Sequence, residues 1–262
     1  MWQYRILETG FFLADGGAMF GAIPKRAWKR KYSSNEENCC VLAMNCVLLW
    51  NEEKVILFDT GVGSKDLGKL SYYQFYNTRN IIDLVKEEGF DPEDVTDVIL
   101  SHLHFDHCGG CTYKDSNNLP RISFPSAKHS VSKSQWESYL NPNLLEKDSF
   151  RKEDLIPVQQ SGLLNLIDKN IELYPNLFLD IYDGHTSGQL LLSFRHKEEL
   201  IVCPSDVIPT KAHLSDEWIS AYDISPLQSL NAKMELKEKI KTQKTTFIFY
   251  HDAYKKSIKI KR

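Results

Sequence analysis

Runs of apolar residues separated by polar or glycine-rich turns dominate the first half of the chain. Residues 41–50 are almost entirely apolar, residues 51–54 are polar, and residues 55–58 are apolar again, which predicts a β-hairpin. A glycine-rich loop follows at residues 59–63. We therefore expect paired strands early in the chain, with this loop at the end of the second strand.

A helical pattern occupies residues 80–88. Its apolar positions recur at helical spacing, and Gly89 follows as the kind of residue that commonly ends a helix. Residues 91–93 then predict a short helical turn, and residues 98–100 predict a short buried strand. His102 thus begins where a buried strand ends.

Strands and helices mix through the rest of the chain. The further strands that we expect are residues 122–124, 177–182, 190–194, 200–203 and 247–250. The further helices that we expect are residues 133–140 and 227–241. Residues 141–166 have weaker periodicity, and Pro142, Pro157 and Gly162 interrupt it. This stretch could cover a site as a lid, or it could be a variable insertion.

Size and charge narrow the class of protein. A length of 262 residues and a hydrophobic content of 42% suit a single domain over residues 1–262, since no repeat or linker divides the chain. The net charge of -3 leaves no positive field to attract phosphate backbones, so we expect no nucleic-acid partner. Glu8 interrupts any N-terminal signal, and the longest apolar run, residues 39–50, is too short to span a bilayer. We expect a cytoplasmic protein with no membrane partner.

The six cysteines do not resemble a disulfide framework, because the chain is large and shows no secretion signal. Free thiols are therefore expected. Cys108 and Cys111 form a Cys-Gly-Gly-Cys sequence, which could be a redox site or half of a zinc site. No second pair completes four thiolates, and most isolated pairs of this kind have no such role, so this reading is a minor alternative.

The main chemical pattern is the segment His102-Leu103-His104-Phe105-Asp106-His107. His102, His104 and Asp106 alternate, so their side chains could converge from one side of an extended backbone, whereas His107 must point elsewhere. Side chains that point in two directions indicate two metal sites. Helical zinc motifs place their histidines four residues apart, so the spacing here favours a site where a strand passes into a loop.

Other strand ends carry further residues of the ligand type. His185, Asp206 and His251 each follow one of the expected strands, so each strand end offers one ligand. A lone histidine is more often structural or exposed, and we expect this of His129 and His196.

The order of these features along the chain is Asp59-Thr60-Gly61, the segment 102–107, His185, Asp206 and His251. In this order they resemble the metallo-β-lactamase superfamily, and the resemblance spans nearly the whole chain. It implies an α/β fold, a four-layer αββα sandwich in which two sheets carry helices outside and the metals lie at one edge.

The resemblance also implies a division of ligands between two divalent cations. One cation would be held by His102, His104 and His185, and the second by Asp106, His107 and His251, with Asp206 between them. Imidazole suits zinc, manganese or iron, and zinc is the metal that we expect first. A bridging carboxylate holds two cations roughly 3.5–4 Å apart, a spacing useful for hydrolysis. Asp59 would orient a ligand.

Within the superfamily, residues 15–21 and the segment His104-Phe105-Asp106-His107 resemble the quorum-quenching N-acyl-homoserine lactonases and methyl parathion hydrolase. We therefore predict a hydrolase in which a hydroxide held between the metals attacks a lactone or ester of a small acylated molecule. Asp106 and Asp206 are the expected catalytic residues, and Asp106 would orient the hydroxide or pass a proton.

The expected substrate contacts are Phe20, Trp28, His213 and Tyr222. Several lactonases place a tyrosine shortly after the bridging aspartate, whereas residues 207–210 here contain none. Tyr222 or His213 could take its place.

Two other activities stay open within the same fold. A phosphotriesterase would use the same site, and a diiron redox protein would use the same metals differently. Diiron members typically carry a glutamate at the second histidine of the cluster, so His104 favours hydrolysis. The expected partner is a small ester or lactone, and a homodimer is left open.

Overall fold

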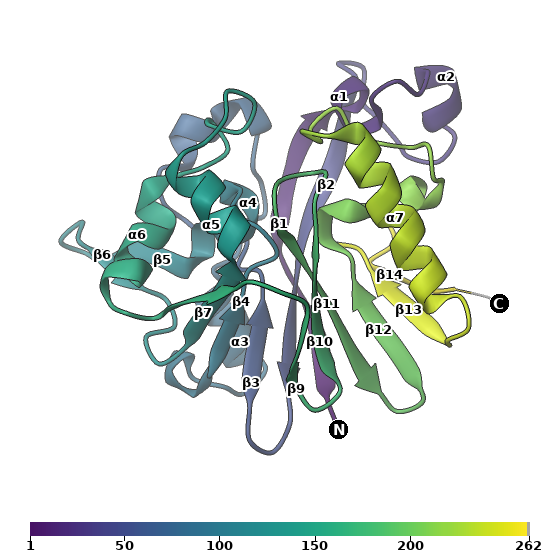
Figure 1. Cartoon of the computed structure of the whole chain (residues 1–262). Helices are drawn as coiled ribbons and strands as arrows, with labels where there is room; N and C mark the ends of the chain where they lie inside the picture. The colour runs from purple at the N-terminus through teal and green to yellow at the C-terminus, as the bar shows by residue number, and fades with distance from the viewer. Residues whose placement is uncertain (261–262) are drawn as a thin grey trace.

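The computed structural model describes residues 1–260, and residues 261–262 of the expected domain lie outside this range. Two six-stranded sheets form the centre of the molecule, and helices lie on the outer side of each sheet (Figure 1). The order of the layers is helix, sheet, sheet and helix, which confirms the expected αββα architecture. A search of the described residues finds no helix with the length and apolar character needed to cross a membrane.

The first sheet has the strand order β1-β2-β3-β4-β7-β8. Its strands are β1 (Gln3–Asp15), β2 (Cys39–Trp50), β3 (Val55–Phe58), β4 (Asp97–Ile99), β7 (Lys128–Ser132) and β8 (Leu164–Ile167). The antiparallel pair β2–β3 is the predicted hairpin, while β3, β4, β7 and β8 run parallel. Parallel strands end at the same edge of a sheet, and the loop that carries His102 leaves β4 at this edge.

The second sheet has the strand order β14-β13-β12-β11-β10-β9. Its strands are β9 (Ile171–Tyr174), β10 (Leu177–Tyr182), β11 (Gln189–His196), β12 (Glu199–Cys203), β13 (Thr245–Ile248) and β14 (Ser257–Ile260). Neighbouring strands are antiparallel except β12 and β13. A separate small hairpin consists of β5 (Thr112–Lys114) and β6 (Pro120–Ile122).

The helices divide between the two outer layers. On the first sheet lie α3 (Ile81–Glu87), α5 (Lys133–Leu140) and α6 (Lys152–Gln160), and on the second lies α7 (Pro226–Ile240) (Figure 1). The short helices are α1 (Gly16–Phe20), α2 (Lys25–Trp28) and α4 (Phe105–Cys108). The 3-10 turns are η1 (Leu67–Tyr73), η2 (Pro92–Asp94), η3 (Gly109–Cys111), η4 (Ser205–Val207) and η5 (Lys211–Leu214).

Alternation along the strands separates three apolar layers. In β2, Val47 and Leu49 belong to the core between the sheets, whereas Leu48 belongs to the core between the first sheet and its helices. In β11, Leu190 lies between the sheets and Leu191 packs in the core beneath α7. Successive side chains of a strand point to opposite faces, and both faces are apolar because each sheet is covered on both sides.

The bounds of two expected strands differ from the structure, and the strand expected at residues 247–250 is β13, which ends at Ile248. The expected strand at residues 122–124 is β6, which ends at Ile122, and Phe124 is buried in the first core instead. The weakly periodic stretch 141–166 contains α6 and part of β8. Pro157 lies inside α6 and cannot donate to the carbonyl of Glu153, which accepts a hydrogen bond from Thr112 Oγ1 at 2.9 Å instead. The helix forms because one face is buried, which local periodicity does not reveal.

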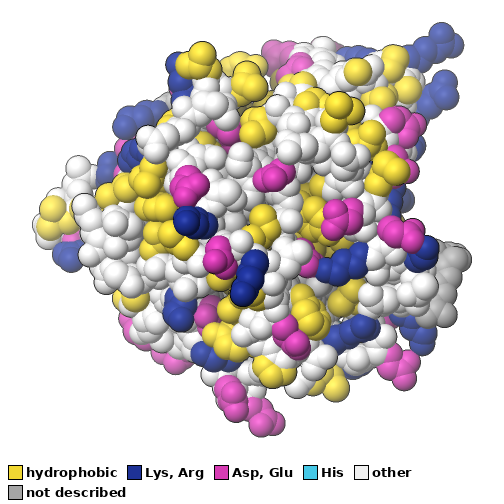
Figure 2. Space-filling model, in the orientation of Figure 1, with side chains coloured by type: hydrophobic (Ala, Val, Ile, Leu, Met, Phe, Trp, Pro, Cys, Tyr) yellow, Lys and Arg dark blue, Asp and Glu magenta, His cyan; other side chains and the backbone are white. Residues whose placement is uncertain are grey.

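The surface agrees with the small net charge. Side chains of Lys and Arg are interspersed with those of Asp and Glu on the face shown in Figure 2. Many of the surface charges are paired, as in Lys244–Glu198 and Lys259–Glu199. Such mixed pairs create only weak long-range fields.

Candidate metal centre

Five histidines and two aspartates meet at one edge of the two sheets. The first sheet supplies the segment 102–107 after β4, while the second supplies His185 after β10, Asp206 in η4 after β12 and His251 after β13. Each of the seven residues is at most 9% exposed. Residues that are up to 149 positions apart, as in His102 and His251, therefore lie in one buried cluster.

The segment 102–107 changes conformation at its middle. His104 has an extended backbone and precedes α4, which contains Asp106 and His107. Strict alternation would group Asp106 with His102 and His104. The helical turn instead places Asp106 with His107 in one ligand group, while His102 and His104 belong to another, and a group of His102, His107 and Asp206 links the two.

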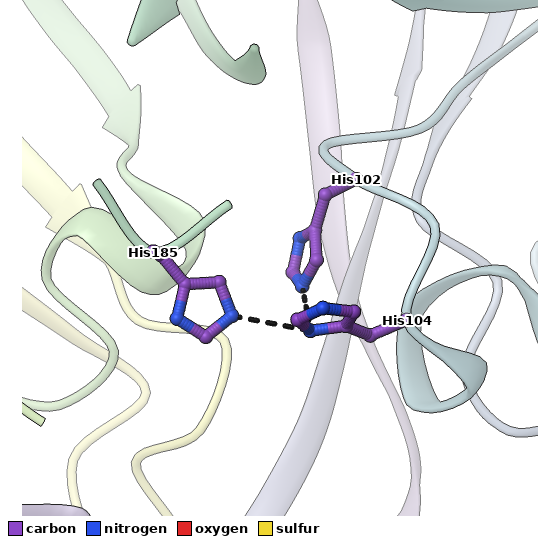
Figure 3. Close-up of side chains that lie close together, drawn as sticks. All are labelled: His102, His104 and His185. Atoms are coloured by element: carbon purple, nitrogen blue, oxygen red, sulfur yellow. Dashed lines mark hydrogen bonds between the residues drawn. The ribbon is translucent and has the colours of Figure 1, made fainter. Parts of the chain in front are cut away.

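The first group consists of His102, His104 and His185 (Figure 3). His104 Nδ1 lies 3.1 Å from His102 Nε2 and 3.2 Å from His185 Nε2. His102 and His104 come from the first sheet, and His185 approaches from the second (Figure 3). Three ring nitrogens facing one another are the usual protein contribution to a catalytic zinc site.

The second group consists of Asp106, His107 and His251. Nε2 of His107 lies 3.3 Å from Nε2 of His251, and Asp106 Oδ2 lies 3.7 Å and 3.6 Å from these two atoms. Asp206 lies between the two groups. Its Oδ2 is 3.3 Å from Nε2 of both His185 and His251, so one carboxylate contacts ligands of both groups.

In four of these histidines, the outward ring nitrogen, which points away from the other ligands, has a hydrogen-bond partner. This partner fixes which ring nitrogen carries the proton. His185 Nδ1 donates to Asp223 Oδ1 at 2.9 Å, and His251 Nδ1 donates to the carbonyl of Ala43 at 2.9 Å. The other two pairs are His107 Nδ1 with Asp59 Oδ2, at 3.0 Å, and His102 Nδ1 with Ser101 Oγ, also at 3.0 Å. A neutral imidazole that donates through one nitrogen presents a lone pair at the other. The inward nitrogens are therefore oriented as metal ligands.

These residues fit bound cations. The inward nitrogens of His107 and His251, 3.3 Å apart, need a proton or a cation between them, because two facing lone pairs repel. Among the described residues, the buried Asp206 Oδ1 and His104 Nε2 have no hydrogen-bond partner. Imidazole nitrogens combined with carboxylate oxygens suit zinc and other divalent transition metals. The donor set and its geometry thus favour metal binding over a purely structural cluster.

Electrostatics in the cluster is dominated by the two partners Asp206 and His107. Burial alone would raise the pKa of Asp206, but His251, His107 and His185 hold it well below its ordinary value. Burial alone would lower the pKa of His107, but Asp206, Asp106 and Asp59 hold it well above its ordinary value. Without a cation, the buried carboxylates and imidazoles of the cluster therefore favour one another's charged forms.

A cavity of about 180 Å³ opens beside the cluster. Its polar end is formed by His104, Asp106, His185, Asp206 and His251. Its apolar wall includes Phe12, Met19, Leu42, Tyr73, Leu145 and Tyr222. A buried ligand cluster at one end of an apolar cavity is the arrangement expected of a site that binds a small molecule and acts on it chemically.

Only one of the four expected substrate contacts lines this cavity. Tyr222 is part of the wall and is 40% exposed. Phe20, Trp28 and His213 are buried and do not line it. Phe20 stacks between the other two rings at 4.9 Å from each, and His213 Nε2 donates to the carbonyl of Met19 at 2.8 Å. These three residues pack behind the wall near Met19, so their position argues against direct contact with a substrate.

Several residues of the site had no signal in the sequence. Phe12, Tyr73 and Leu145 line the cavity from β1, η1 and the loop after α5. Glu146 also lines it, and its Oε1 lies 3.5 Å from His104 Nε2. None of these residues belongs to a recognisable motif, because the chain brings them together only on folding.

Cys108 and Cys111 lie outside the ligand groups of the described residues. Both are fully buried, and Cys108 Sγ donates to the carbonyl of Leu103 at 3.3 Å. Burial raises the pKa of Cys111 to about 12. Thiols of this kind are packing residues, because redox and metal chemistry need the thiolate.

Comparison with known proteins gives a consistent family. Residues 41–251 match the model of the Metallo-beta-lactamase superfamily. An N-acyl homoserine lactonase from Bacillus thuringiensis is 26% identical over 219 residues, which cover 79% of this chain and 80% of that protein. An N-acyl homoserine lactonase from Bacillus cereus is 28% identical over 227 residues, which cover 82% and 83% of the two chains.

Solved structures show the same fold. The crystal structure of a probable metal-dependent hydrolase from Staphylococcus aureus has a TM-score of 0.91 at 28% identity, covering 98% of this chain and 92% of that one. An N-acyl homoserine lactone hydrolase, with the product N-hexanoyl-L-homoserine bound at its catalytic metal center, has a TM-score of 0.76 at 24% identity, covering 95% and 93%. The chain therefore belongs to the metallo-beta-lactamase superfamily and is a metal-dependent hydrolase.

Proposed function

We propose that the protein is a dinuclear hydrolase that cleaves a lactone or ester of a small acylated molecule. The observation that carries this proposal is the buried set of seven ligand side chains at the polar end of an apolar cavity. The relatives from Bacillus thuringiensis and Bacillus cereus are N-acyl homoserine lactonases, which supports a lactone as the first substrate class to test.

We assign one cation to the first ligand group and one to the second. His102, His104 and His185 would hold one, Asp106, His107 and His251 the other, and Asp206 would contact both. Zinc fits this donor set, and manganese and iron fit it too. Such cations, when bound, polarise a carbonyl and bring the pKa of water close to neutrality, so that no serine or cysteine nucleophile is needed.

Asp106 and Asp206 have different roles in this account. Asp206 is 9% exposed and contacts histidines of both groups, so it holds the two halves of the centre together. Asp106 lines the cavity and contacts only the second group. Its carboxylate is placed to accept a proton from the attacking water and to return it to the leaving group.

The cavity wall supplies binding and orientation. Phe12, Met19, Leu42 and Leu145 offer an apolar surface to an acyl chain, and each buried methylene contributes about 0.8 kcal/mol. Burial raises the pKa of Tyr222, so its hydroxyl stays protonated at neutral pH. We assign this hydroxyl as the donor to the substrate carbonyl, in place of the tyrosine that residues 207–210 lack.

A substrate panel tests the proposal. Lactones of increasing acyl length, aryl esters and phosphotriesters are offered to the wild type, to Asp206→Ala and to Asp168→Ala, a control at an exposed aspartate. We expect the wild type and the control to cleave lactones or esters and to contain two cations per chain, and Asp206→Ala to lose hydrolysis and at least one cation. Full hydrolysis by a metal-free Asp206→Ala protein would overturn the mechanism. A preference for phosphotriesters, or redox-active iron without ester cleavage, would overturn the substrate class.

A further inference from the structure

His104 differs from the other four histidines of the centre. Their outward nitrogens have partners at 2.9–3.0 Å, whereas the outward Nε2 of His104 is buried without a hydrogen bond to any described residue. A carboxylate oxygen, Glu146 Oε1, lies 3.5 Å from this nitrogen. The side chain of Glu146 is only 2% exposed, so water does not compete for it.

Glu146 is held firmly by neutral donors. Asn143 Nδ2 donates to Glu146 Oε2 at 2.5 Å, and Thr186 Oγ1 donates to Oε1. Thr186 Oγ1 in turn accepts a hydrogen bond from Gln135 Nε2 at 3.1 Å. No lysine or arginine takes part in these contacts. The carboxylate therefore keeps its capacity to accept from the imidazole of His104.

The position of Glu146 links two ligand-bearing loops. His104 belongs to the loop after β4 in the first sheet, and Thr186 directly follows His185 in the loop after β10 of the second sheet. Glu146 contacts His104 and Thr186, so it joins a loop of the first sheet to a loop of the second. The adjacent residue, Leu145, lines the cavity.

We propose that Glu146 is a positioning residue for the cation held by His102, His104 and His185. A carboxylate can only accept, so His104 must carry its proton on Nε2 and present the lone pair of Nδ1 to the other two rings. Without Glu146 the ring is free to place its proton on Nδ1, which cannot then bind a cation. This inference rests on the two-cation site proposed above.

A second consequence concerns the loop at residues 141–149. Asn143 Oδ1 accepts from the backbone N–H groups of Leu145 and Glu146, at 2.8 Å and 3.1 Å, so the side chain that holds Glu146 also shapes the wall beside it. A cation bound at Nδ1 of His104 makes the Nε2–H group of the same ring a stronger donor to Glu146. Metal loading should therefore protect this loop from amide hydrogen exchange.

Zinc affinity tests the proposal directly. Metal-free protein is titrated with zinc against a coloured chelator, for the wild type and for Glu146→Gln. The glutamine amide keeps one acceptor oxygen, which can face either His104 or Asn143, so Glu146→Leu, which has no acceptor, is measured beside it and gives the decisive result. We expect one of the two zinc ions to bind roughly 10–100-fold more weakly, and the other to keep its affinity.

Two further variants serve as the positive and the negative control for this measurement. Asp223→Ala removes the partner of His185 Nδ1 and should weaken the same zinc ion. Glu137→Gln alters an exposed carboxylate on α5 and should leave both affinities unchanged. Circular dichroism of the metal-free proteins checks that each variant is folded. Unchanged affinities for both zinc ions in folded Glu146→Leu would overturn the proposal.

Hydrogen exchange of the wild type provides a test without any substitution. Residues 141–149 should exchange more slowly with zinc than without it, and equal exchange would count against the role of Glu146. A wild type that binds no zinc would overturn both this inference and the two-cation site. Failure to cleave any lactone would overturn only the proposed substrate, because affinity and exchange do not depend on hydrolysis.

Discussion

The metal centre and the outer part of the cavity wall, which Leu145 and Tyr222 form, are built in opposite ways. Every ligand of the centre is at most 9% exposed, whereas Leu145 and Tyr222 in the wall are 78% and 40% exposed. The ligands follow strand ends, while Leu145 and Tyr222 lie in loops. Groups that follow strand ends and are buried by their neighbours keep a fixed geometry, whereas exposed loop residues vary more readily in sequence and conformation. Chemistry thus belongs to the rigid part of the site and substrate choice to the variable part.

The largest effects should come from breaking either half of the centre. His185→Ala removes a ligand of the first group, and His251→Ala removes one of the second. Each variant should lose one cation and keep the other, with kcat/KM for the best substrate falling roughly 10³-fold, since a metal contributes several kcal/mol to the transition state. Metal analysis and kinetics measure both quantities.

His196→Ala is the matched control for these variants, because His196 lies outside the ligand groups at the end of β11. It should keep both cations and full activity. Full metal content in His185→Ala or His251→Ala would contradict the division into two groups.

The next effect concerns the stability that comes from a histidine which is buried but lies outside the metal centre. His129 is buried in β7, its Nδ1 donates to the carbonyl of Ala127 at 3.0 Å, and burial lowers its pKa to about 4. The unfolded chain, with a histidine pKa of about 6.5, binds a proton first as the pH falls. Neutral His129 therefore contributes stability above pH 6.5 that is lost towards pH 4, up to about 3 kcal/mol.

His129→Asn should remove this part of the pH dependence, since asparagine does not titrate. Denaturant unfolding at pH 7.5 and pH 4.5 measures the free energy of unfolding for both proteins. The loss between the two pH values should be smaller in the variant, while its metal content stays that of the wild type. An identical loss in both proteins would show that His129 does not titrate as described.

A smaller effect is expected from the polar group of the wall. Tyr222→Phe removes the hydroxyl that we assign to the substrate carbonyl, and one such hydrogen bond contributes about 0.5–1.5 kcal/mol. We expect kcat/KM to fall roughly 3–10-fold, with metal content unchanged. Tyr72→Phe is the control, because Tyr72 is 77% exposed and does not line the cavity. Equal losses in the two variants would argue against a specific contact.

The smallest effect should come from the apolar rim of the wall. Leu145→Ala should lower kcat/KM for long acyl chains about two- to fourfold relative to short ones, because only part of this side chain can be buried by substrate. Leu144→Ala is the control, since Leu144 is 84% exposed and lies outside the wall. A preference for chain length that does not change in Leu145→Ala would remove this residue from the acyl site.

The contrast between centre and wall also explains what could be predicted from the sequence. The αββα fold is implied by the resemblance that Asp59-Thr60-Gly61, the segment 102–107, His185, Asp206 and His251 carry, while apolar runs predict individual strands such as β3 and β10. Ligands at strand ends leave a local pattern, since the chemistry restricts the residue type at each one.

The wall left no such pattern. Any apolar residue can line a cavity, so Phe12 and Tyr73 could not be distinguished from core residues, and Phe20 and Trp28 could not be recognised as support for α1. Glu146 lies in a stretch of weak periodicity that becomes ordered only through contacts with residues far along the chain, such as Thr186. Tertiary burial decides such positions, and one sequence does not display it.

The number of metal ions bound per chain tests the central claim most directly. Elemental analysis of the purified wild type and of Asp206→Ala, the residue that contacts both ligand groups, gives this number. We expect two divalent cations per wild-type chain and the loss of at least one of them from Asp206→Ala. A wild type that binds fewer than two under metal-replete conditions, or an Asp206→Ala protein that keeps both, would contradict this expectation.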